Sequence, residues 1–428
     1  MATNNIDSSV EKPPIRKITA LAAPKDSRVA EELTKSPRLI SVINLVDAMM
    51  SDAYVMRASD VHIDPDEDKL RIRFRIDGVM SEIYIFPNEI HSEVITRIKV
   101  LAGLRTDEHQ MAQDGRFKVE IKGVGFVDIR VSIAPTYHGE NCVMRILAEK
   151  SQDITLEALG YSDEHLKKVQ VAIERPFGMI LVVGPTGSGK TTSLYSILKK
   201  LNTEEVSIIT IEDPVEYSLE GVDQIQVNER TGLTFAHGLR FILRQDPNII
   251  MVGEIRDEET AAIAVNAAMT GHKLLSTLHA NDAPTALPRL IEMHIEPFLI
   301  ASTINIIIGQ RLVRTICSVC KASKKLSASE LDNLKTLIPK ALFKDNHIFY
   351  EGQGCLECHQ TGFRGRVGIH EILEINTSIR DLIMQHANAS QIRETAIKNG
   401  MVTMLEDGFT KAILGITSIE EVLRVFRE

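Results

Sequence analysis

The chain has 428 residues, of which 44% are hydrophobic and 25% are charged. This length exceeds what one hydrophobic core usually serves, so we expect two or three domains. A formal net charge of −9 disfavours a general nucleic-acid-binding role. The sequence has no apolar run of about eighteen residues and no signal-peptide core at its N-terminus, which predicts a cytoplasmic protein.

Residues 1–37 carry scattered charges, prolines and little periodic apolar pattern, which predicts a flexible tail. We expect order to begin near Leu39. The apolar periodicity there predicts a helix with one buried face, made of Leu39, Val42, Ile43, Val46, Met49 and Met50.

Alternating and periodic segments then predict a small α+β domain over residues 38–150. The segment 70–76 alternates arginines with apolar residues, as a strand with one polar face does. Asp77-Gly78 is typical of a hairpin turn. Further elements are predicted in chain order: a strand over 79–86, a helix over 88–104, and strands over 117–121, 125–134 and 141–147.

Residues 151–428 alternate strands with helices, which predicts a parallel α/β sheet. The expected strands cover 179–183, 206–211, 249–252 and 273–278. A cysteine-bearing insertion is expected over 311–362, and helices over 370–428 should form a C-terminal tail. Ser418 and Glu421 have the spacing of a capping box at the start of the last helix.

The segment 184–191 fits the pattern G-x-x-x-x-G-K-[ST] of a phosphate-binding loop. An apolar strand should precede it, and a helix over 191–201 should follow. Such a loop turns backbone N–H groups and a helix N-terminus toward a polyphosphate. We expect Lys190 to reach the phosphates of ATP and the Thr191 hydroxyl to bind Mg²⁺. The predicted nucleotide-binding residues are Gly184, Pro185, Thr186, Gly187, Ser188, Gly189, Lys190, Thr191 and Thr192.

Polar side chains follow three of the predicted strands. Glu254 ends the apolar run 248–254, and we expect it to act as the general base on water. Glu212 should help to hold Mg²⁺ or water, because ligands bind at the carboxyl edge of open parallel sheets. His279 can stand there as a sensor of the γ-phosphate. The alternatives are a surface glutamate at 254 and a structural histidine at 279.

Four of the five cysteines form two Cys-x-x-Cys pairs, Cys317 with Cys320 and Cys355 with Cys358. Two such pairs can hold one ion in tetrahedral four-thiolate geometry, which predicts a structural zinc site with no open position. Reduced free thiols are the alternative. Cys142 lies in a predicted apolar strand and is expected to be a core residue.

Short motifs occur in order along the chain from about Arg38 to the C-terminus. They lie at 58–65, 73–79, 113–116, 184–191, 210–217, 243–247, 253–257, 270–279 and 310–312, followed by the cysteine pairs. Together they resemble the ATPases of type II secretion and type IV pilus assembly, the GspE/PilB group. In that group Gly-Glu stands where other phosphate-loop enzymes carry an aspartate, so Gly253 is no sign of inactivity.

The resemblance implies a RecA-like P-loop core preceded by a PAS-like α+β domain, in a homo-hexamer with nucleotide between subunits. It also implies that arginines of the preceding domain reach the phosphates from a neighbouring subunit. Arg97 and Arg116 match the family positions best, with Arg130 a further candidate and local ion pairs the alternative. Relatives carry paired arginines and a proline before the segment 113–116, where this chain has residues 109–112, His-Gln-Met-Ala.

The implied activity is hydrolysis of Mg²⁺-ATP at the inner face of the plasma membrane. A polytopic platform protein of the PilC/GspF kind is the expected partner, with pilins as indirect partners and no nucleic acid. Assembly and secretion members carry similar cysteines, whereas retraction members generally lack them, which favours extension over retraction. The expected role is type IV pilus assembly. Type II secretion through a pseudopilus is the nearest alternative. A non-hydrolysing, nucleotide-gated ring and a nucleic-acid motor are the others.

Overall fold

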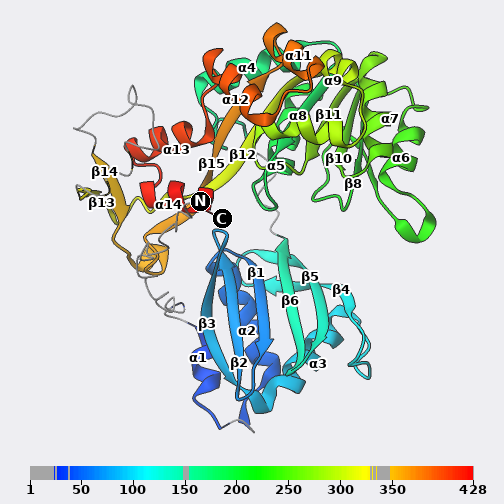
Figure 1. The fold of residues 1–428 in the computed structure, drawn as a ribbon. Coiled ribbons are helices and arrows are strands. Elements are labelled where there is room, and N and C mark those ends of the chain that lie inside the picture. Colours follow the sequence, from blue (N-terminus) through cyan, green and yellow to red (C-terminus); the bar gives the residue numbers. More distant parts are fainter. Residues whose placement is uncertain are drawn as a thin grey trace, which may run out of the picture. The chain divides into compact units, whose positions relative to one another are not determined.

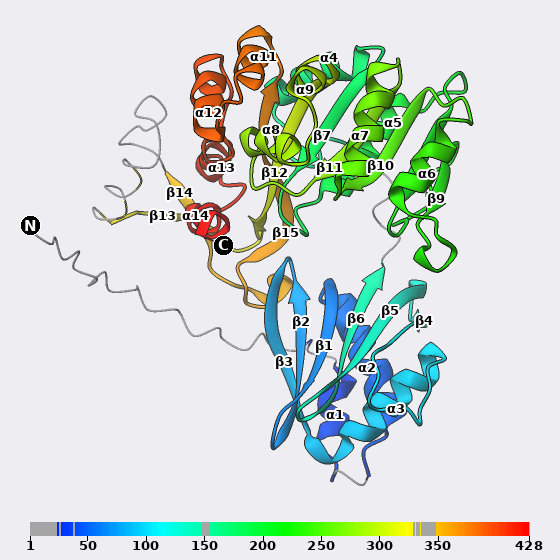
Figure 2. The same ribbon diagram turned by 45° about the vertical axis from the view of Figure 1, so that its right-hand side comes forward.

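The computed structural model describes residues 24, 27–36, 39–147, 154–327, 330, 334 and 348–427. The chain divides into two compact units, Met1–Leu147 and Ala148–Glu428. Figure 1 shows both units, and Figure 2 shows them from a second direction. Most of the predicted tail, including residues 1–23, lies outside the described residues. No helix in the described ranges is long and apolar enough to cross a membrane.

The first unit is a six-stranded antiparallel sheet with helices on one face. Its strand order is β3-β2-β1-β6-β5-β4. Alternate side chains such as Ile63, Phe74 and Ile129 are buried under helices α2 and α3. The period of two along each strand leaves the opposite face to polar residues. The elements are α2 (Val42–Val55), β1 (Ala58–Pro65), β2 (Lys69–Ile76), β3 (Val79–Pro87), α3 (His91–Ala102), β4 (Gln113–Ile121), β5 (Gly125–Thr136) and β6 (Gly139–Leu147).

Regular structure begins earlier than the sequence predicts. Helix α1 (Arg28–Leu33) lies inside the segment that was expected to be a flexible tail. The Ser27 side chain caps this helix by accepting from the Val29 backbone. Val29 is fully buried in the core of the first unit. One buried apolar side chain and one cap therefore order a segment whose composition is that of a tail.

The buried face of α2 also differs from the predicted one. Leu39 and Ile43 are 72% and 54% exposed, whereas Leu45 is fully buried. The helix begins only at Val42, after its cap Ser41. The apolar stripe that faces the sheet therefore runs through Leu45, Val46, Met49, Met50 and Ala53, spaced by three and four residues.

The second unit is built on a seven-stranded sheet of order β15-β12-β7-β11-β10-β8-β9. Every neighbouring pair is parallel except β12 with β15. β7 and β11 are buried along their whole length, as strands covered on both faces are. The strands are β7 (Gly178–Val183), β8 (Ile208–Glu212), β9 (Asp223–Gln226), β10 (Ile249–Ile255), β11 (Lys273–Leu278), β12 (Ile304–Ile316) and β15 (Phe363–Glu374).

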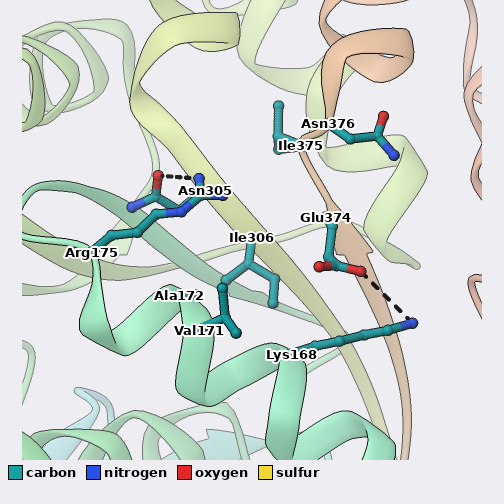
Figure 3. Close-up of a pocket in the computed structure, with 9 residues that line it drawn as sticks. All are labelled: Lys168, Val171, Ala172, Arg175, Asn305, Ile306, Glu374, Ile375 and Asn376. Carbon is teal, nitrogen blue, oxygen red and sulfur yellow. Dashed lines mark hydrogen bonds and ion pairs between the residues drawn. The ribbon is translucent and has the colours of Figure 1, made fainter.

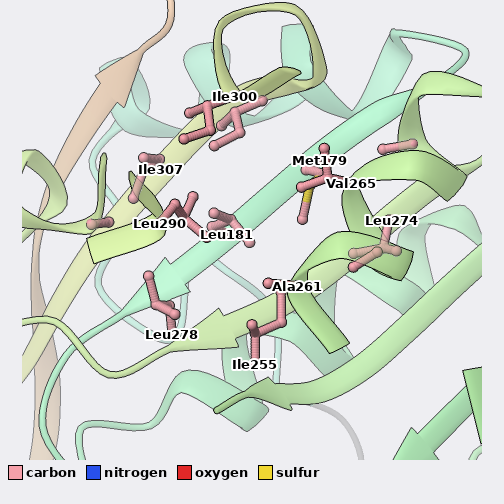
Figure 4. Packing of buried hydrophobic residues seen from close by; sticks show 14 of the residues in the cluster. Met179, Leu181, Ile255, Ala261, Val265, Leu274, Leu278, Leu290, Ile300 and Ile307 are labelled. Carbon is pink, nitrogen blue, oxygen red and sulfur yellow. The ribbon is translucent and has the colours of Figure 1, made fainter. Parts of the chain in front are cut away.

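Helices cover both faces of this sheet. α4 and α5 pack on one face, and α6 to α9 pack on the other. Figure 4 shows the second layer, in which Val265 of α7 and Leu290 of α8 meet Met179 and Leu181 of β7. The helices are α4 (Asp163–Glu174), α5 (Lys190–Leu201), α6 (Phe235–Ile242), α7 (Glu258–Met269), α8 (Ala283–Glu292) and α9 (Pro297–Thr303).

The cysteine-bearing segment projects from the paired strands β12 and β15. It carries its own two-stranded ladder of β13 (Lys321–Lys324) and β14 (Phe349–Gly352). Residues 370–374 are strand and not part of a helical tail, because this isoleucine-bearing segment continues the β15 pairing with β12. The tail that follows consists of α11 (Thr377–Met384), α12 (Ala389–Lys398), α13 (Met404–Ile413) and α14 (Ile419–Arg427).

The predicted capping box of α14 forms only in part. The Glu421 backbone N–H donates to the Ser418 hydroxyl at 3.3 Å. The Glu421 carboxylate, however, accepts from the Arg314 guanidinium at 2.7 Å and from Arg424 at 2.7 Å. It therefore joins the last helix to β12 instead of closing the cap.

Candidate functional site

The phosphate-loop segment connects a buried strand to a helix, as the sequence predicts. β7 ends at Val183 and α5 begins at Lys190, so the amino end of α5 faces the loop. Gly189 has a φ of 84°, a left-handed conformation that favours glycine. A Cβ atom at Gly184 would lie 2.3 Å from the carbonyl oxygen of Gln310. The path of the loop therefore requires glycine at both positions.

Lys190 and Ser188 place polar atoms inside this loop. The Lys190 ammonium donates to the carbonyl oxygens of Gly184 at 2.9 Å and Pro185 at 3.1 Å. Burial lowers the pKa of Lys190, and the charge of Glu254 partly offsets this effect. The Ser188 hydroxyl is buried without a hydrogen-bond partner in the described part of the chain. A buried hydroxyl needs a partner, and a phosphate oxygen is one that fits. The other predicted loop residues are Thr186 and Gly187, which are exposed, and Thr191 and Thr192, which are partly exposed.

Gln310 braces the phosphate loop from β12, and sequence reasoning gave it no role. Its side chain is fully buried. The amide nitrogen donates to the Ser188 carbonyl oxygen at 2.8 Å. The amide oxygen accepts from the Ser193 hydroxyl at 2.7 Å and from the Tyr161 hydroxyl at 3.4 Å. A buried amide with both ends bonded fixes the loop relative to the sheet. The motif at 310–312 was the only sequence signal that pointed to it.

Glu254 is held between His279 and Arg256 at the carboxyl end of β10. His279 lies 2.8 Å from one carboxylate oxygen, and the Arg256 guanidinium donates to the other at 2.5 Å. Desolvation raises the pKa of Glu254, but the hydrogen bonds from Arg256 and His279 outweigh it, and the pKa falls below its usual value. The carboxylate therefore stays ionised at neutral pH. Glu254 and His279, which the sequence analysis assigned separate roles at neighbouring strand ends, are thus in direct contact. Arg256 is a partner that the sequence analysis did not assign.

Glu212 lies at the end of β8, but its carboxylate binds neutral groups of the protein. It accepts from the Tyr195 hydroxyl, from Thr210 at 2.6 Å and from Gln224 at 3.1 Å. The Glu212 side chain is buried. Burial of the neighbouring Tyr195 hydroxyl raises the pKa of Tyr195. These contacts join α5, β8 and β9. The structure gives Glu212 no hydrogen bond or ion pair with Lys190 or Glu254, so a structural role competes with the predicted one.

The predicted arginines of the first unit lie on two different surfaces. Arg116 on β4 stands opposite Arg130 on β5, which stands opposite Arg145 on β6. These three share the polar face of the sheet. The Arg116 guanidinium binds Asp128 at 3.1 Å and is largely exposed. Arg97 belongs to α3 on the other face of the sheet, and it lies 3.7 Å from Asp47 of α2. Arg116 and Arg130 are therefore neighbours on the polar face of the sheet, whereas Arg97 lies on the other face.

His109, at the departure from the family pattern, is itself exposed but contacts a buried ion pair of Lys99 with Glu140. Its ring lies 2.8 Å from the Glu140 carboxylate. Glu140 also pairs with Lys99 at 2.7 Å, and the Lys99 side chain is fully buried. Lys99 in turn donates to the Glu108 carbonyl oxygen. The segment 109–112 is thus anchored to the α3 helix and to β6 by its own contacts.

The four cysteines of the two Cys-x-x-Cys pairs converge as predicted, with all sulfur atoms within 4.8 Å of one another. The sulfur–sulfur distances include 3.8 Å for Cys317 with Cys355, 3.8 Å for Cys320 with Cys358 and 3.7 Å for Cys355 with Cys358. A tetrahedral zinc–thiolate site with bonds of about 2.3 Å has sulfur atoms about 3.8 Å apart. The residues present therefore fit a zinc ion. Cys142 is fully buried in the core of the first unit, as expected.

A small pocket lies at the opposite edge of the second unit's sheet from the phosphate loop (Figure 3). It lies between α4 and the amino end of β12. Its charged side chains already have partners. Arg175 donates to Asn305 at 2.9 Å, and Lys168 lies 3.8 Å from Glu374. This pocket is therefore separate from the groups that surround Lys190.

The fold and the phosphate loop define a RecA-like P-loop ATPase with a preceding α+β unit. The chain belongs to the family described as "Type II/IV secretion system protein", which matches residues 36–424. It is 43% identical over 396 residues to the type IV pilus assembly ATPase PilB of Myxococcus xanthus, covering 92% of this chain and 69% of that protein. It is 44% identical over 406 residues to the type II secretion system ATPase E of Vibrio cholerae, covering 94% of this chain and 79% of that protein.

Solved structures share this fold. The ATPase DotB of Legionella pneumophila aligns with a TM-score of 0.65 at 21% identity, covering 92% of this chain and 98% of that one. The pilus retraction motor PilT with bound ADP aligns with a TM-score of 0.58 at 26% identity, covering 89% of this chain and 96% of that one. The resemblance to the GspE/PilB group is thus confirmed, and the curated relatives include both pilus and secretion ATPases.

Proposed function

We propose that the chain is a Mg²⁺-dependent motor ATPase that powers type IV pilus assembly by driving the polymerisation of pilins. The observation that supports this most is the ionised Glu254, held by His279 and Arg256 at the sheet edge where the phosphate loop ends. The negative charge of Glu254 favours the protonated form of Lys190 in that loop. A positioned carboxylate beside a phosphate cradle is what hydrolysis of a nucleoside triphosphate requires.

Each group of this site has one task in the proposed reaction. Lys190 and the N–H groups at the start of α5 would hold the phosphates, and the Thr191 hydroxyl would ligate Mg²⁺, which neutralises phosphate charge when bound. Glu254 orients the attacking water and accepts its proton. His279 and Arg256 hold the two carboxylate oxygens. Glu212 supports α5 through Tyr195 at the side of the site.

The arginines of the first unit are proposed to complete the site of a neighbouring subunit in a homo-hexamer. Arg116 and Arg130 lie side by side on the polar face of the sheet, and guanidinium groups suit the spread charge of a transferring phosphoryl group. Arg97 is the alternative donor, on the opposite surface. If Arg116→Ala lowers turnover by about a hundredfold or more while Arg97→Ala does not, the polar face of the sheet supplies the arginine that acts in trans. The reverse result assigns it to α3.

We propose the coupling to the membrane, and the choice of extension over retraction, from what the family resemblance implies. The ring would act on a polytopic platform protein at the inner face of the plasma membrane, and the four-thiolate site would stabilise the segment between β12 and β15. The presence of the four clustered cysteines supports an assembly or secretion role over retraction, as the family resemblance implies. Type II secretion is the second candidate, because a relative of that name is as similar as the pilus protein.

The test replaces the chromosomal gene with a Lys190→Ala version and follows surface filaments and secreted proteins separately. Loss of surface pili with normal secretion supports pilus assembly. Loss of secretion with normal pili assigns the chain to type II secretion. Normal pili and normal secretion would contradict both. Metal content of the purified variant serves as the control for folding, because Lys190 is remote from the cysteine pairs in sequence and makes no contact with them.

A further inference from the structure

Three side chains with metal-ligating atoms converge inside the second unit, outside the phosphate loop and the cysteine pairs. His165 belongs to α4, His370 to β15 and Asp407 to α13. One ligand atom from each lies within 4.8 Å of the other two. The exposed fractions of these residues are 3%, 0% and 6%. Helices α4 and α13 both pack against β15 (Figure 1), so the cluster lies where three elements meet.

The two histidines carry ring nitrogens without partners. Nδ1 of His165 and both ring nitrogens of His370 are buried and have no hydrogen-bond partner among the described residues. The backbone of Gly160 influences the pKa of His370 but lacks the geometry of a hydrogen bond. Tyr161 stacks on the His370 ring, with centroids 3.8 Å apart. A buried imidazole with two unpartnered nitrogens and a fixed plane indicates a missing partner.

The protonation states suit metal binding. Burial lowers the pKa of His370 well below its usual value, and Lys411 and His165 lower it further. Burial also lowers the pKa of His165. Both rings are therefore neutral at neutral pH, which is the form that ligates metals. One oxygen of Asp407 accepts from the His370 backbone N–H at 2.8 Å and from Lys411 at 2.5 Å. The bond from the His370 backbone fixes the carboxylate, as outer partners fix metal ligands.

We propose that His165, His370 and Asp407 form a second metal site, which binds a divalent transition-metal ion such as Zn²⁺ and ties α4, β15 and α13 together. Two imidazoles and a carboxylate are a ligand set that zinc accepts, with water at the fourth position. The proposal rests on the folded RecA-like unit and is independent of the proposed function. His370 on β15 pairs with Gln310 on β12 in the sheet register. The proposed ion would therefore lie close to the residue that braces the phosphate loop.

The charges around the cluster set how tightly the ion binds. Asp407 supplies one negative charge, and Lys411 opposes the ion with one positive charge. Lys168 and Glu164, on the same helix as His165, act on its ring with opposite signs. With one carboxylate against one ammonium, this site should bind zinc more weakly than the four thiolates do. Removing the Lys411 charge should therefore tighten binding, whereas a purely structural role for Lys411 would make the same change loosen it.

The first experiment counts metal ions. The purified full chain is stripped with a chelator, reloaded with Zn²⁺ alone, dialysed and analysed for metal by mass spectrometry. We expect two ions per wild-type chain. A Cys355→Ser, Cys358→Ser variant should keep one, and a His370→Gln variant should keep a different one. His165→Asn is the second variant if His370→Gln does not fold. A wild-type chain that holds one ion, or histidine variants that still hold two, would overturn the proposal.

The second experiment measures the affinity of this site in the cysteine-substituted chain. Lys411→Met should tighten Zn²⁺ binding by roughly tenfold or more, since it removes a unit charge next to the ion. Lys411→Arg keeps the charge and is the matched control, with little change expected. Unchanged or weaker zinc binding in Lys411→Met would overturn the proposal. Circular dichroism of each variant separates loss of binding from loss of fold.

Discussion

Substitution of Gln310 by leucine should loosen the phosphate loop without touching any group expected to contact the phosphates. The Gln310 amide joins β12 to the Ser188 carbonyl at 2.8 Å and to the Ser193 hydroxyl at 2.7 Å. Leucine has a similar volume but can form neither bond. The Ser188 carbonyl oxygen then faces an apolar side chain in the interior, and the loop loses its tie to the sheet.

The expected magnitude follows from these two bonds. A buried polar group left without a partner costs about 1–3 kcal/mol. Ser193 can turn its hydroxyl back toward its own helix, so its share lies at the low end of that range. The free energy of unfolding should fall by about 2–4 kcal/mol. Nucleotide affinity should fall about tenfold, because the phosphates must then also order the loop, and a tenfold change corresponds to about 1.4 kcal/mol.

Isothermal titration with ADP and thermal unfolding of the same samples measure both quantities. Gln310→Glu is the matched variant, since it keeps the acceptor for Ser193 but loses the donor to Ser188. It should weaken nucleotide binding about as much as leucine does. Tyr161→Phe removes only the 3.4 Å contact and should change little. If Gln310→Leu binds ADP as tightly as the wild type while its melting temperature falls, the bracing argument is wrong.

Two other predictions concern the site's electrostatics and its metal. Arg256→Ala removes a hydrogen-bond donor that lowers the pKa of Glu254. This pKa should therefore rise, and the acid limb of the pH–rate profile should move toward neutral pH. An unmoved limb would exclude Glu254 as the titrating base. Cys358→Ser should lower the zinc content of the cysteine site to near zero and reduce the melting temperature by several degrees, whereas Cys142→Ser should leave the zinc content unchanged. Equal zinc in both variants would contradict the four-thiolate assignment.

The parts of the site that local pattern encodes were predictable. The strand over 179–183 and the helix over 191–201 match β7 and α5 to within one residue, because an apolar run, a glycine-rich loop and a helical periodicity follow each other directly. The cysteine cluster was predictable for the same reason, since each Cys-x-x-Cys pair is local and only one fold-back is needed. The location of Glu254 and His279 at one edge of the sheet followed from the rule that parallel strands end at one edge, but their direct contact was not predicted.

The rest depends on contacts between segments far apart in the chain. Gln310 reaches Ser188 across 122 residues, and the short motif at 310–312 does not by itself specify that contact. His165, His370 and Asp407 lie on three separate elements. The sequence of each element has no pattern that indicates a metal site. Glu212 shows the converse case. Its position at a strand end was predicted, but the direction of its side chain was set by Tyr195, Thr210 and Gln224, which no local pattern specifies.

We expect the phosphate loop and Glu254 to form a site that hydrolyses ATP. Phosphate release from Mg²⁺-ATP by the purified full chain, compared with its Glu254→Gln variant, tests this most directly. Glutamine keeps the size of the side chain and can still bond to its neighbours, but it cannot accept a proton from water. We predict that the variant binds ATP with near-normal affinity and releases phosphate at least about a hundredfold more slowly. Equal rates for the two proteins would contradict the account.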